Sequence, residues 1–532
     1  MKIHHFSLVC CLLLLIGCAR RGRPEGGPKD FDKPIMVRTD PEFKSLHFEA
    51  DEIKIYFDEY IKLKNVTSEL IVSPPLKYPV QITPLGTPSK KITLKLSDTL
   101  QENTTYTFNF AQSILDNTEG NVLDNFKYIF STGDYIDSLR IKGTIKDAFD
   151  LEMIENPTIM LYPVHENFND SIIYTEKPFY VGRTIDSLNW EITNIKEGKY
   201  QLVALNDTRK NYKYDPKEDK IAFKAGFITI PGDSIFDLTL FKEILPFALV
   251  SRPKEVSKGH IILGFEGESK DVRIRVLSET PDDFKAIYAK DIKTDTLNYW
   301  FNNYEKDTLL MEVSKDKFID SIKIAIKEEE IDSMKLSFSS PGILHLRDTL
   351  KIGSTVPIMK IDTSRFQLID KDSVNVPFRL KLSPNRFIID FDFQKEVQQN
   401  YKLFVTPGGI EDVFGVQNDS LITKFKTGKI ADYCSIFLTI RNIQNYPVII
   451  DLIDDQGKVV AKQFATEPRE YEFKNLRPAR FKVRIIYDAN GNQVWDTGNF
   501  MKKLQPEKVY YIDNVIETKA NWEVNETLTL KP

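Results

Sequence analysis

Two segments of this chain are repeated further along it, and this duplication constrains the fold more than any other feature. The segment "TYTFNFAQSILDNTEGNVLDNFKYIFSTG" (residues 105–133) aligns without a gap with "NYKLFVTPGGIEDVFGVQNDSLITKFKTG" (residues 400–428). The shift is 295 at every pair, the difference between Tyr401 and Tyr106, and Glu411 replaces Asp116. Chance does not keep register over such a length, so we expect the two segments to fold alike.

A second duplication joins residues 190–215 ("WEITNIKEGKYQLVALNDTRKNYKYD") to residues 471–496 ("YEFKNLRPARFKVRIIYDANGNQVWD"). The shift here is 281, which is 471 minus 190, so that Asp207 meets Asp488 and Asp215 meets Asp496. A chain of 532 residues is too long for one hydrophobic core. The two duplications therefore predict three to five domains, with two domain types used twice.

Short runs that alternate apolar and polar residues make up most of the chain. Residues 52–57 ("EIKIYF") and 91–96 ("KITLKL") are typical, and Asp, Asn, Gly and Pro bound such runs. This is the pattern of half-buried strands. Phenylalanine (35) and tyrosine (22) are plentiful, which suits the cores of β-sandwiches. We predict an all-β fold with only short turns of helix.

Motifs in the first duplicated region resemble a known domain. They are "FDE" at residues 57–59, "NTTYTFNF", a turn with Ile114, Asp116 and Gly120, and a closing "FSTG". Together they are similar to the bacterial Ig-like domain first described in S-layer proteins, in the form common at the front of lipoproteins from Bacteroidota. The resemblance covers residues 34–134, and residues 357–429 less fully because the front strands are shorter there.

The second duplicated region has a different resemblance. A segment of the form "NL(x)PG(x)Y" before a polar loop is similar to the small prealbumin-like or carboxypeptidase-regulatory-like β-sandwiches of secreted bacterial proteins. The first copy keeps Gly198 of this motif, whereas the second has Ala479. The two resemblances imply a tandem array of Ig-like and prealbumin-like β-sandwich modules behind a lipoprotein signal peptide.

The expected order of the modules follows from these assignments. A signal peptide (residues 1–18) and a flexible tether (19–33) precede an Ig-like domain (34–134) and a prealbumin-like sandwich (135–245). A further β-rich module (246–356), a divergent second Ig-like domain (357–429) and a second prealbumin-like sandwich (430–532) complete the chain.

The front of the chain reads "MKIHHFSLVCCLLLLIGC", and its apolar run is too short to span a bilayer. Its last four residues resemble a bacterial lipobox, which implies cleavage before Cys18 and attachment of lipid, such as palmitate, to that cysteine. An ordinary signal peptide is the alternative. After Cys18 only Cys434 remains, so no intramolecular disulfide is possible. No acidic cluster resembling a surface-export signal follows Cys18, which favours the outer membrane with the modules in the periplasm.

One loop places oxygen-bearing residues at alternating positions, as a calcium cage requires. Counting from one, Asp488, Asn490, Asn492, the carbonyl of Val494 and Asp496 stand at positions one, three, five, seven and nine. The low charge count would make such a site weak. The alternative is a long turn in which Asp and Asn side chains bind their own backbone, with the intervening glycine at positive φ.

The first copy of the loop has a cation where the second has an amide. Arg209 stands at the third position, while Asp207, Asn211, Asp215 and Glu218 keep their oxygens. A guanidinium there would replace an ion by an internal salt bridge. We therefore predict that the first copy binds no ion.

Asp followed by Ser or Thr and then an aliphatic residue or Met recurs twelve times. The motif resembles the O-glycosylation sequon of Bacteroidota, and the alternative is a set of turns before strands. It begins at Asp98, Asp137, Asp170, Asp186, Asp233, Asp295, Asp307, Asp320, Asp332, Asp348, Asp372 and Asp419.

Composition and motifs argue against several function classes. The net charge of -5, with both signs mixed, provides no basic stripe for nucleic acid. The mature histidines are isolated from one another, so a zinc motif of the HExxH type is absent, as are P-loop and GxSxG motifs. The adjacent Asp58 and Glu59 are expected to end a strand rather than to form a glycosidase pair.

We therefore predict a non-catalytic lipoprotein of the cell envelope that binds or scaffolds other envelope proteins, for example as an accessory subunit of an outer-membrane assembly or secretion complex. We expect no cofactor other than calcium at the Asp488 loop, where the backbone-binding turn is the alternative. One alternative is a carbohydrate-binding lipoprotein of a glycan-uptake system, for which only Trp190, Trp300, Trp495 and Trp522 offer indole platforms. The other is an enzyme with its site in residues 246–356.

Overall fold

The computed structural model describes residues 30–531 except 152, 153, 155, 156, 292, 328, 329 and 341. The expected signal peptide, its Cys18 and most of the expected tether lie outside this range. The prediction of an all-β fold is confirmed, with 47% of the described residues in strands and 3% in helices. Within the described residues, no helix combines the length and the hydropathy of a membrane span.

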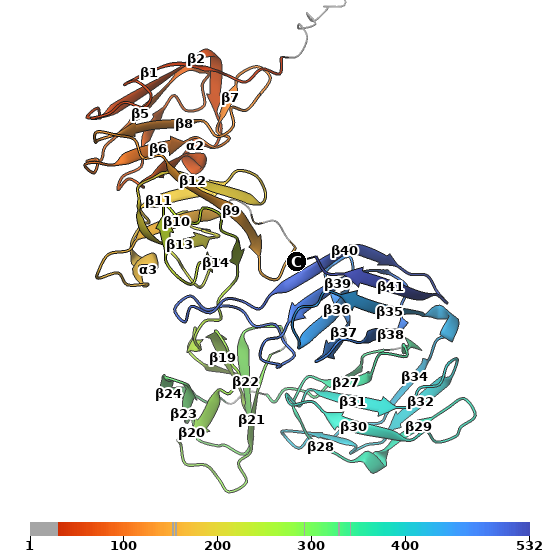
Figure 1. The fold of residues 1–532 in the computed structure, drawn as a ribbon. Coiled ribbons are helices and arrows are strands. Elements are labelled where there is room, and N and C mark those ends of the chain that lie inside the picture. Colours follow the sequence, from red (N-terminus) through yellow and green to blue (C-terminus); the bar gives the residue numbers. More distant parts are fainter. Residues whose placement is uncertain are drawn as a thin grey trace, which may run out of the picture. The chain divides into compact units, whose positions relative to one another are not determined.

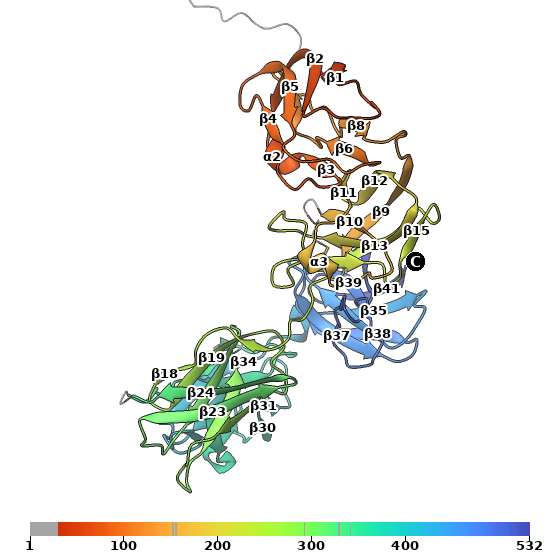
Figure 2. The ribbon, with the colours of Figure 1, turned by 90° about the vertical axis from the view of Figure 1, so that its left-hand side faces the viewer.

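The chain forms two compact units. Among the described residues, the first unit comprises 30–146, 154, 157–214 and 226–238, and the second comprises 147–151, 215–225 and 239–531 with the gaps given above. Figures 1 and 2 show both units as stacks of short strands with few helical turns.

The first unit opens with a two-sheet sandwich. One sheet has the order β1-β2-β5-β4 with β7 paired to β2, and the other has the order β3-β6-β8. Aromatic rings fill the space between the sheets, where Phe130 stacks on Phe48 at 3.7 Å and on Tyr106 at 5.4 Å between ring centroids. The elements are β1 (Met36–Asp40), β2 (Glu52–Leu63), α2 (Val66–Glu69), β3 (Ile71–Ser73), β4 (Gln81–Thr83), β5 (Ser89–Lys95), β6 (Thr105–Asn109), β7 (Ile114–Asp116) and β8 (Lys127–Ser131).

A buried carboxylate closes the turn after β7. Asp116 accepts hydrogen bonds from the backbone N–H groups of Thr118, Glu119, Gly120 and Asn121, at 2.7, 2.7, 3.1 and 2.7 Å. Burial acts to raise the pKa of Asp116, but these four donors outweigh it and lower that pKa.

The rest of the first unit is a sheet in the order β13-β10-β11-β12-β9, with β15 paired to β13. Trp190 is fully buried in it and donates its indole N–H to the carbonyl of Thr144 at 3.0 Å. The elements are β9 (Leu139–Asp147), β10 (Thr158–Pro163), α3 (Ile172–Thr175), β11 (Tyr180–Thr184), β12 (Asn189–Ile195), β13 (Gly198–Leu205) and β15 (Ile228–Ile230).

The second unit includes β14 (Ile221–Phe223), and the chain enters this unit again within β16 (Leu238–Leu240). A third module of two small sheets follows. One sheet has the order β17-β19-β22-β21 with β18 paired to β19, and the other has the order β20-β23-β24. The strands are β17 (Ala248–Leu249), β18 (Lys254–Ser257), β19 (His260–Glu266), β20 (Arg273–Val276), β21 (Ala286–Lys290), β22 (Thr296–Phe301), β23 (Thr308–Lys315) and β24 (Phe318–Ala325).

A second sandwich follows, with sheets β25-β27-β31-β30 and β26-β34-β32-β29 and the pair β28-β33. Its paired strands begin at Leu336, whereas the sequence placed the start of this domain at residue 357. The long front strand β2 of the first copy corresponds here to two strands, β27 and β28. The elements are β25 (Leu336–Phe338), β26 (Gly342–Ile343), β27 (Leu350–Ser354), β28 (Ile358–Ile361), η1 (Thr363–Arg365), β29 (Phe366–Ile369), β30 (Phe378–Leu382), β31 (Ile388–Phe393), β32 (Asn400–Val405), β33 (Ile410–Asp412) and β34 (Leu421–Lys426).

The two Ig-like copies share side-chain contacts at the predicted shift. The hydroxyl of Tyr106 accepts from the N–H of Gln101 at 2.9 Å, and the hydroxyl of Tyr401 accepts from that of Glu396 at 2.9 Å. One expectation was wrong: Asp412 rather than Glu411 takes the place of Asp116, and accepts from the N–H groups of Phe414 and Val416. Asp116 lies ten residues after Tyr106 and Asp412 eleven residues after Tyr401, whereas Phe130 and Phe425 both lie 24 residues after these tyrosines, so the gapless alignment is off by one only around this aspartate.

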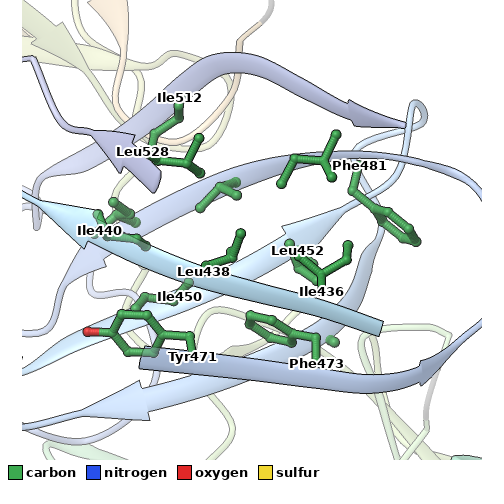
Figure 3. Packing of buried hydrophobic residues seen from close by; sticks show 14 of the residues in the cluster. Ile436, Leu438, Ile440, Ile450, Leu452, Tyr471, Phe473, Phe481, Ile512 and Leu528 are labelled. Carbon is green, nitrogen blue, oxygen red and sulfur yellow. The ribbon is translucent and has the colours of Figure 1, made fainter. Parts of the chain in front are cut away.

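The last sandwich has sheets β38-β35-β41 and β37-β36-β39-β40. Figure 3 shows its core, in which Leu438, Ile450 and Phe473 from three strands point toward one another. The elements are η2 (Ile430–Asp432), β35 (Cys434–Arg441), β36 (Val448–Ile453), β37 (Val459–Ala465), β38 (Glu470–Leu476), β39 (Arg480–Tyr487), β40 (Val509–Glu517) and β41 (Glu523–Thr529).

One ion pair is buried on the β36–β39 sheet. Arg484 and Asp451 lie 2.7 Å apart with side chains 7% and 1% exposed. Replacing Arg484 by Met leaves the Asp451 charge buried and unpaired, so we expect the free energy of unfolding in urea to fall by about 3–5 kcal/mol. Arg484→Met with Asp451→Leu should recover most of that loss. The control Arg480→Met breaks an exposed pair with Glu517 and should cost under about 1 kcal/mol; an equal loss in control and test variant would contradict the expectation.

Candidate functional site

The loop between β39 and β40 contains the residues that the sequence singled out. Asp488 is fully buried at its base, and its carboxylate accepts from the backbone N–H groups of Asn492 at 3.1 Å and Gln493 at 2.8 Å. Gly491 adopts a φ of +74° and Gln493 a φ of +66°, so the chain curls back over the carboxylate. Burial of the acceptor makes these two hydrogen bonds the anchor of the loop.

The two amide side chains of the loop converge on a second carboxylate. Asn490 and Asn492 both donate their NH₂ groups to one oxygen of Asp496, at 2.6 and 2.8 Å. Their own oxygens accept from the N–H groups of Asn492, at 3.0 Å, and Val494, at 2.9 Å. These contacts are those of the turn alternative. Calcium binding, which requires the amide oxygens to face an ion instead, stays a prediction.

Sequence reasoning missed one member of this loop. Glu507 accepts from the N–H groups of Ala489 at 2.7 Å and Asp496 at 3.1 Å. Burial raises its pKa, and the charges of Asp496 and Asp488 raise it further. Glu507 lies eleven residues beyond Asp496, outside the alternating pattern, so no signal in the sequence pointed to it. Among the described residues, no group of three His, Cys, Asp or Glu side chains is arranged to hold a metal.

The first copy of the loop repeats the anchor at the shift of 281. Asp207 accepts from the N–H groups of Asn211 at 3.2 Å and Tyr212 at 2.7 Å, and Tyr212 has a φ of 61°. The two loops therefore share one backbone design. Asp215 and Glu218 belong to the other compact unit, so the salt bridge expected from Arg209 stays a prediction.

The second copy of the loop also holds distant segments of its own unit. The ring of Trp495 lies 4.8 Å from that of Phe149, and its N–H donates to the carbonyl of Glu507 at 3.0 Å. Phe500 donates its N–H to Glu243 at 2.5 Å and meets the ring of Phe223 edge-on at 5.1 Å. We call residues 488–507 the clasp, because they join the segments around residues 149, 223 and 243 to the last sandwich.

Gly498 shows how closely the clasp approaches its neighbours. A Cβ atom there would lie 2.6 Å from the ring of Phe241 and 2.7 Å from the carbonyl of Leu504. Only glycine fits, so the sequence of the clasp is matched to the segment that it holds.

The third module brings a histidine, a serine and a carboxylate together. His260 lies 3.1 Å from Asp332 through Nδ1 and 2.8 Å from the amide oxygen of Asn298 through Nε2, and its ring stacks on Trp300 at 3.5 Å. Ser257 donates to the same oxygen of Asp332, at 2.8 Å, and not to the histidine. Because both ring nitrogens have partners, this group pins the linker after β24 and does not form a nucleophile–base pair.

A cleft of about 860 Å³ lies in the first unit between the Ig-like sandwich and the sheet that follows it. Two of its charged side chains, Arg183 and Lys127, form contacts between the two parts of this unit. Arg183 pairs with Glu69 at 3.3 Å and donates to the carbonyl of Ser68 at 2.9 Å. Lys127 donates to the hydroxyl of Thr193 at 3.1 Å, and burial lowers its pKa.

Comparison with known proteins identifies the first sandwich. Residues 30–132 match the family described as a bacterial Ig-like domain. This agrees with the resemblance drawn from "FDE" and the turn at Asp116. No curated protein matches the sequence.

Several solved structures show remote similarity. The Bacillus anthracis TIE protein is 9% identical with a TM-score of 0.15, and the match covers 96% of this chain and 76% of that one. An S-layer protein, rSbsC(31-844), is 10% identical with a TM-score of 0.15 over 92% and 67% of the two chains. A fragment of alpha-2-macroglobulin from Escherichia coli is 9% identical with a TM-score of 0.18 over 35% and 89%. Scores of this size support no inference about function.

The hydrogen bonds that Asp488 accepts should make a measurable contribution to the free energy of unfolding. Asp488→Ala removes the acceptor of two backbone N–H groups, so we expect the free energy of unfolding to fall by about 1–3 kcal/mol in urea denaturation. Asn490→Ala, at an exposed position of the same loop, is the matched control and should cost less. An Asp488→Ala variant as stable as the wild type would contradict the anchoring role.

The calcium prediction has its own test. If the loop binds calcium, the ion will raise the thermal unfolding midpoint of the full chain in the wild type but not in Asp496→Ala, because a ligand that binds only the folded state stabilises it. The same response in Asp207→Ala as in the wild type would locate the ion in the second copy. A midpoint independent of millimolar calcium would contradict the calcium prediction.

Proposed function

We propose that this chain is a lipid-anchored scaffold of the cell envelope that acts by binding other envelope proteins and catalyses no reaction. The observation that carries the proposal is the way in which successive sheets are locked together by buried contacts. Such joints make each compact unit stiff, which suits the presentation of binding surfaces.

Contacts in each unit support this stiffness. In the first unit, the backbone N–H of Val181 donates to the buried hydroxyl of Ser73 at 3.0 Å, next to the Arg183–Glu69 pair. In the second unit, Asn302 donates to the carbonyl of Val413 at 3.0 Å, and Trp300 packs against Val413 and its neighbours. Polar contacts thus occur at both joints, and apolar packing accompanies them in the second unit.

The exposure of the tryptophans favours protein partners over glycans. Trp190 and Trp300 are 0% and 3% exposed, and Trp495 is engaged by Phe149. Only Trp522 presents much of its ring, at 47% exposed. A glycan-binding site built on indole platforms would need more than one such side chain.

The sequons are compatible with an envelope location. None of the twelve Ser or Thr hydroxyls in these motifs belongs to a buried residue. Eight of these residues are exposed and four are partly exposed, so a modifying enzyme would reach them on the folded chain. We include O-glycosylation of these positions in the proposal.

The anchoring part of the proposal places lipid on Cys18 and the modules in the periplasm, at the outer membrane. The partner would be an envelope protein, such as a subunit of an outer-membrane assembly or secretion complex.

Crosslinking followed by affinity purification from native membranes tests the proposal, with Cys18→Ser as the matched variant. We expect the wild type to sediment with outer membranes and to bring envelope proteins with it. The Cys18→Ser variant should appear in the soluble fraction, because acyl chains provide the whole affinity for the bilayer. Equal membrane association of both proteins would contradict the anchor, and a wild type that brings no protein along would contradict the scaffold role.

A further inference from the structure

The two Ig-like copies differ most on one sheet face. In the first copy, Tyr106 and Phe130 point into the core, so their neighbours along β6 and β8 face outward. Apart from Lys127, which donates to Thr193, these outward residues are uncharged, and several are buried: Thr105, Thr107 and Ser131 are 2%, 6% and 1% exposed. The outer face of this sheet is therefore covered.

The next module of the first unit provides the cover. The hydroxyl of Thr105 accepts from the backbone N–H of Asp137 at 2.9 Å, and that of Thr107 lies 3.5 Å from the side-chain oxygen of Asn194. Strand β12, which ends with Asn194 and Ile195, lies against β6 in this arrangement. A flat sheet face of this domain type is thus packed against another β-module.

In the second copy, the equivalent outer face is exposed and contains lysines. At the shift of 295, Lys402 stands for Thr107, Lys426 for Ser131, and Lys424 for Ile129. Tyr401, Leu403 and Phe425 fill the core, so the lysines face outward, and Lys424 and Lys426 are exposed. Strands β29, β32 and β34 contain three lysines and no carboxylate.

The arrangement of these lysines works against the stability of the isolated domain. Lys402 and Lys424 are direct cross-strand partners, and like charges in that position repel each other. In the described part of the chain, neither of them nor Lys426 forms an ion pair. Beside them lie Phe404, whose ring is 4.3 Å from the Lys402 ammonium, and Ile422, which is 58% exposed.

We propose that the outer face of β29, β32 and β34 in the second Ig-like domain is the docking surface for an acidic face of a partner protein. Carboxylates of the partner would relieve the repulsion between Lys402 and Lys424, and an apolar side chain would cover Phe404 and Ile422. We infer that the partner is a protein because, in the first copy, a β-module covers the equivalent face. Opposite charge provides selectivity and speeds association.

This inference rests on the proposed scaffold role and is tested with the lipidated full chain in native membranes. A photo-crosslinking phenylalanine analogue in place of Ile422 reports what touches the face, and the same analogue in place of Ile319, an apolar residue 68% exposed in the third module, is the control. Lys402→Glu, Lys424→Glu and Lys426→Glu are combined in one chain. A matched triple changes Lys254, Lys317 and Lys323, which are exposed in the third module, to Glu.

We expect the probe at 422 to form an adduct with a protein through a peptide rich in Asp and Glu, and the probe at 319 to form none. The charge-reversed face should reduce the adduct by roughly tenfold or more, whereas the matched triple should not. An adduct with lipid alone, with a second copy of the chain, or of equal yield in both triples would overturn the inference. If the wild type still brings down an envelope protein while the probe at 422 captures none, the docking face is wrong and the scaffold role stands. If the wild type brings down no envelope protein and the probe at 422 captures none, both the scaffold role and the docking face are wrong.

A stability measurement guards against a misfolded variant. Lys402→Thr places the residue of the first copy in the second and removes a repulsive pair. We expect its thermal midpoint to be equal to or above that of the wild type, with less adduct at 422. A lower midpoint would mean that the lysines serve the fold, and would overturn the docking inference.

Discussion

Loops of antiparallel sheets leave backbone N–H groups without strand partners, and the whole array depends on how this chain satisfies them. Aspartate carboxylates do so at equivalent places in both copies of each domain type: Asp116 and Asp412 at the ends of β7 and β33, and Asp207 and Asp488 in the long loops. An unsatisfied buried N–H costs about 1–3 kcal/mol, comparable to a sizeable fraction of the stability of a small domain. With these groups satisfied, each module presents firm faces that its neighbours can pack against.

The duplications made the fold class and the repeated loops predictable, because a shared register transfers the pattern of one strand to its copy. The gapless alignment was wrong where the second copy has one more residue before the aspartate and one fewer after it. For this reason it paired Glu411 with Asp116, although Asp412 closes the turn. Contacts between distant segments were also out of reach. Phe149 and Trp495 meet across the fold, and no spacing in the sequence encodes such a meeting.

What distinguishes the copies lies on their surfaces rather than in their cores. Tyr106 and Tyr401 stack on Phe130 and Phe425 with the same centroid separation of 5.4 Å. On the outer surface, the face of β6 and β8 is buried in the first copy, whereas the equivalent face of β32 and β34 in the second copy is exposed and contains three lysines. Duplication of a stable core thus leaves its faces free to acquire separate contacts, one within the chain and one, on our account, with a partner.

We infer that the buried Asp488 carboxylate holds the clasp closed on its own unit. Hydrogen exchange of the full chain tests it most directly. We predict that the amides of Asn492 and Gln493 and the segment around Phe149 exchange slowly in the wild type, and that all of them exchange faster together in Asp488→Ala. Rapid exchange of these amides in the wild type, or an unchanged segment around Phe149 in the variant, would contradict the account.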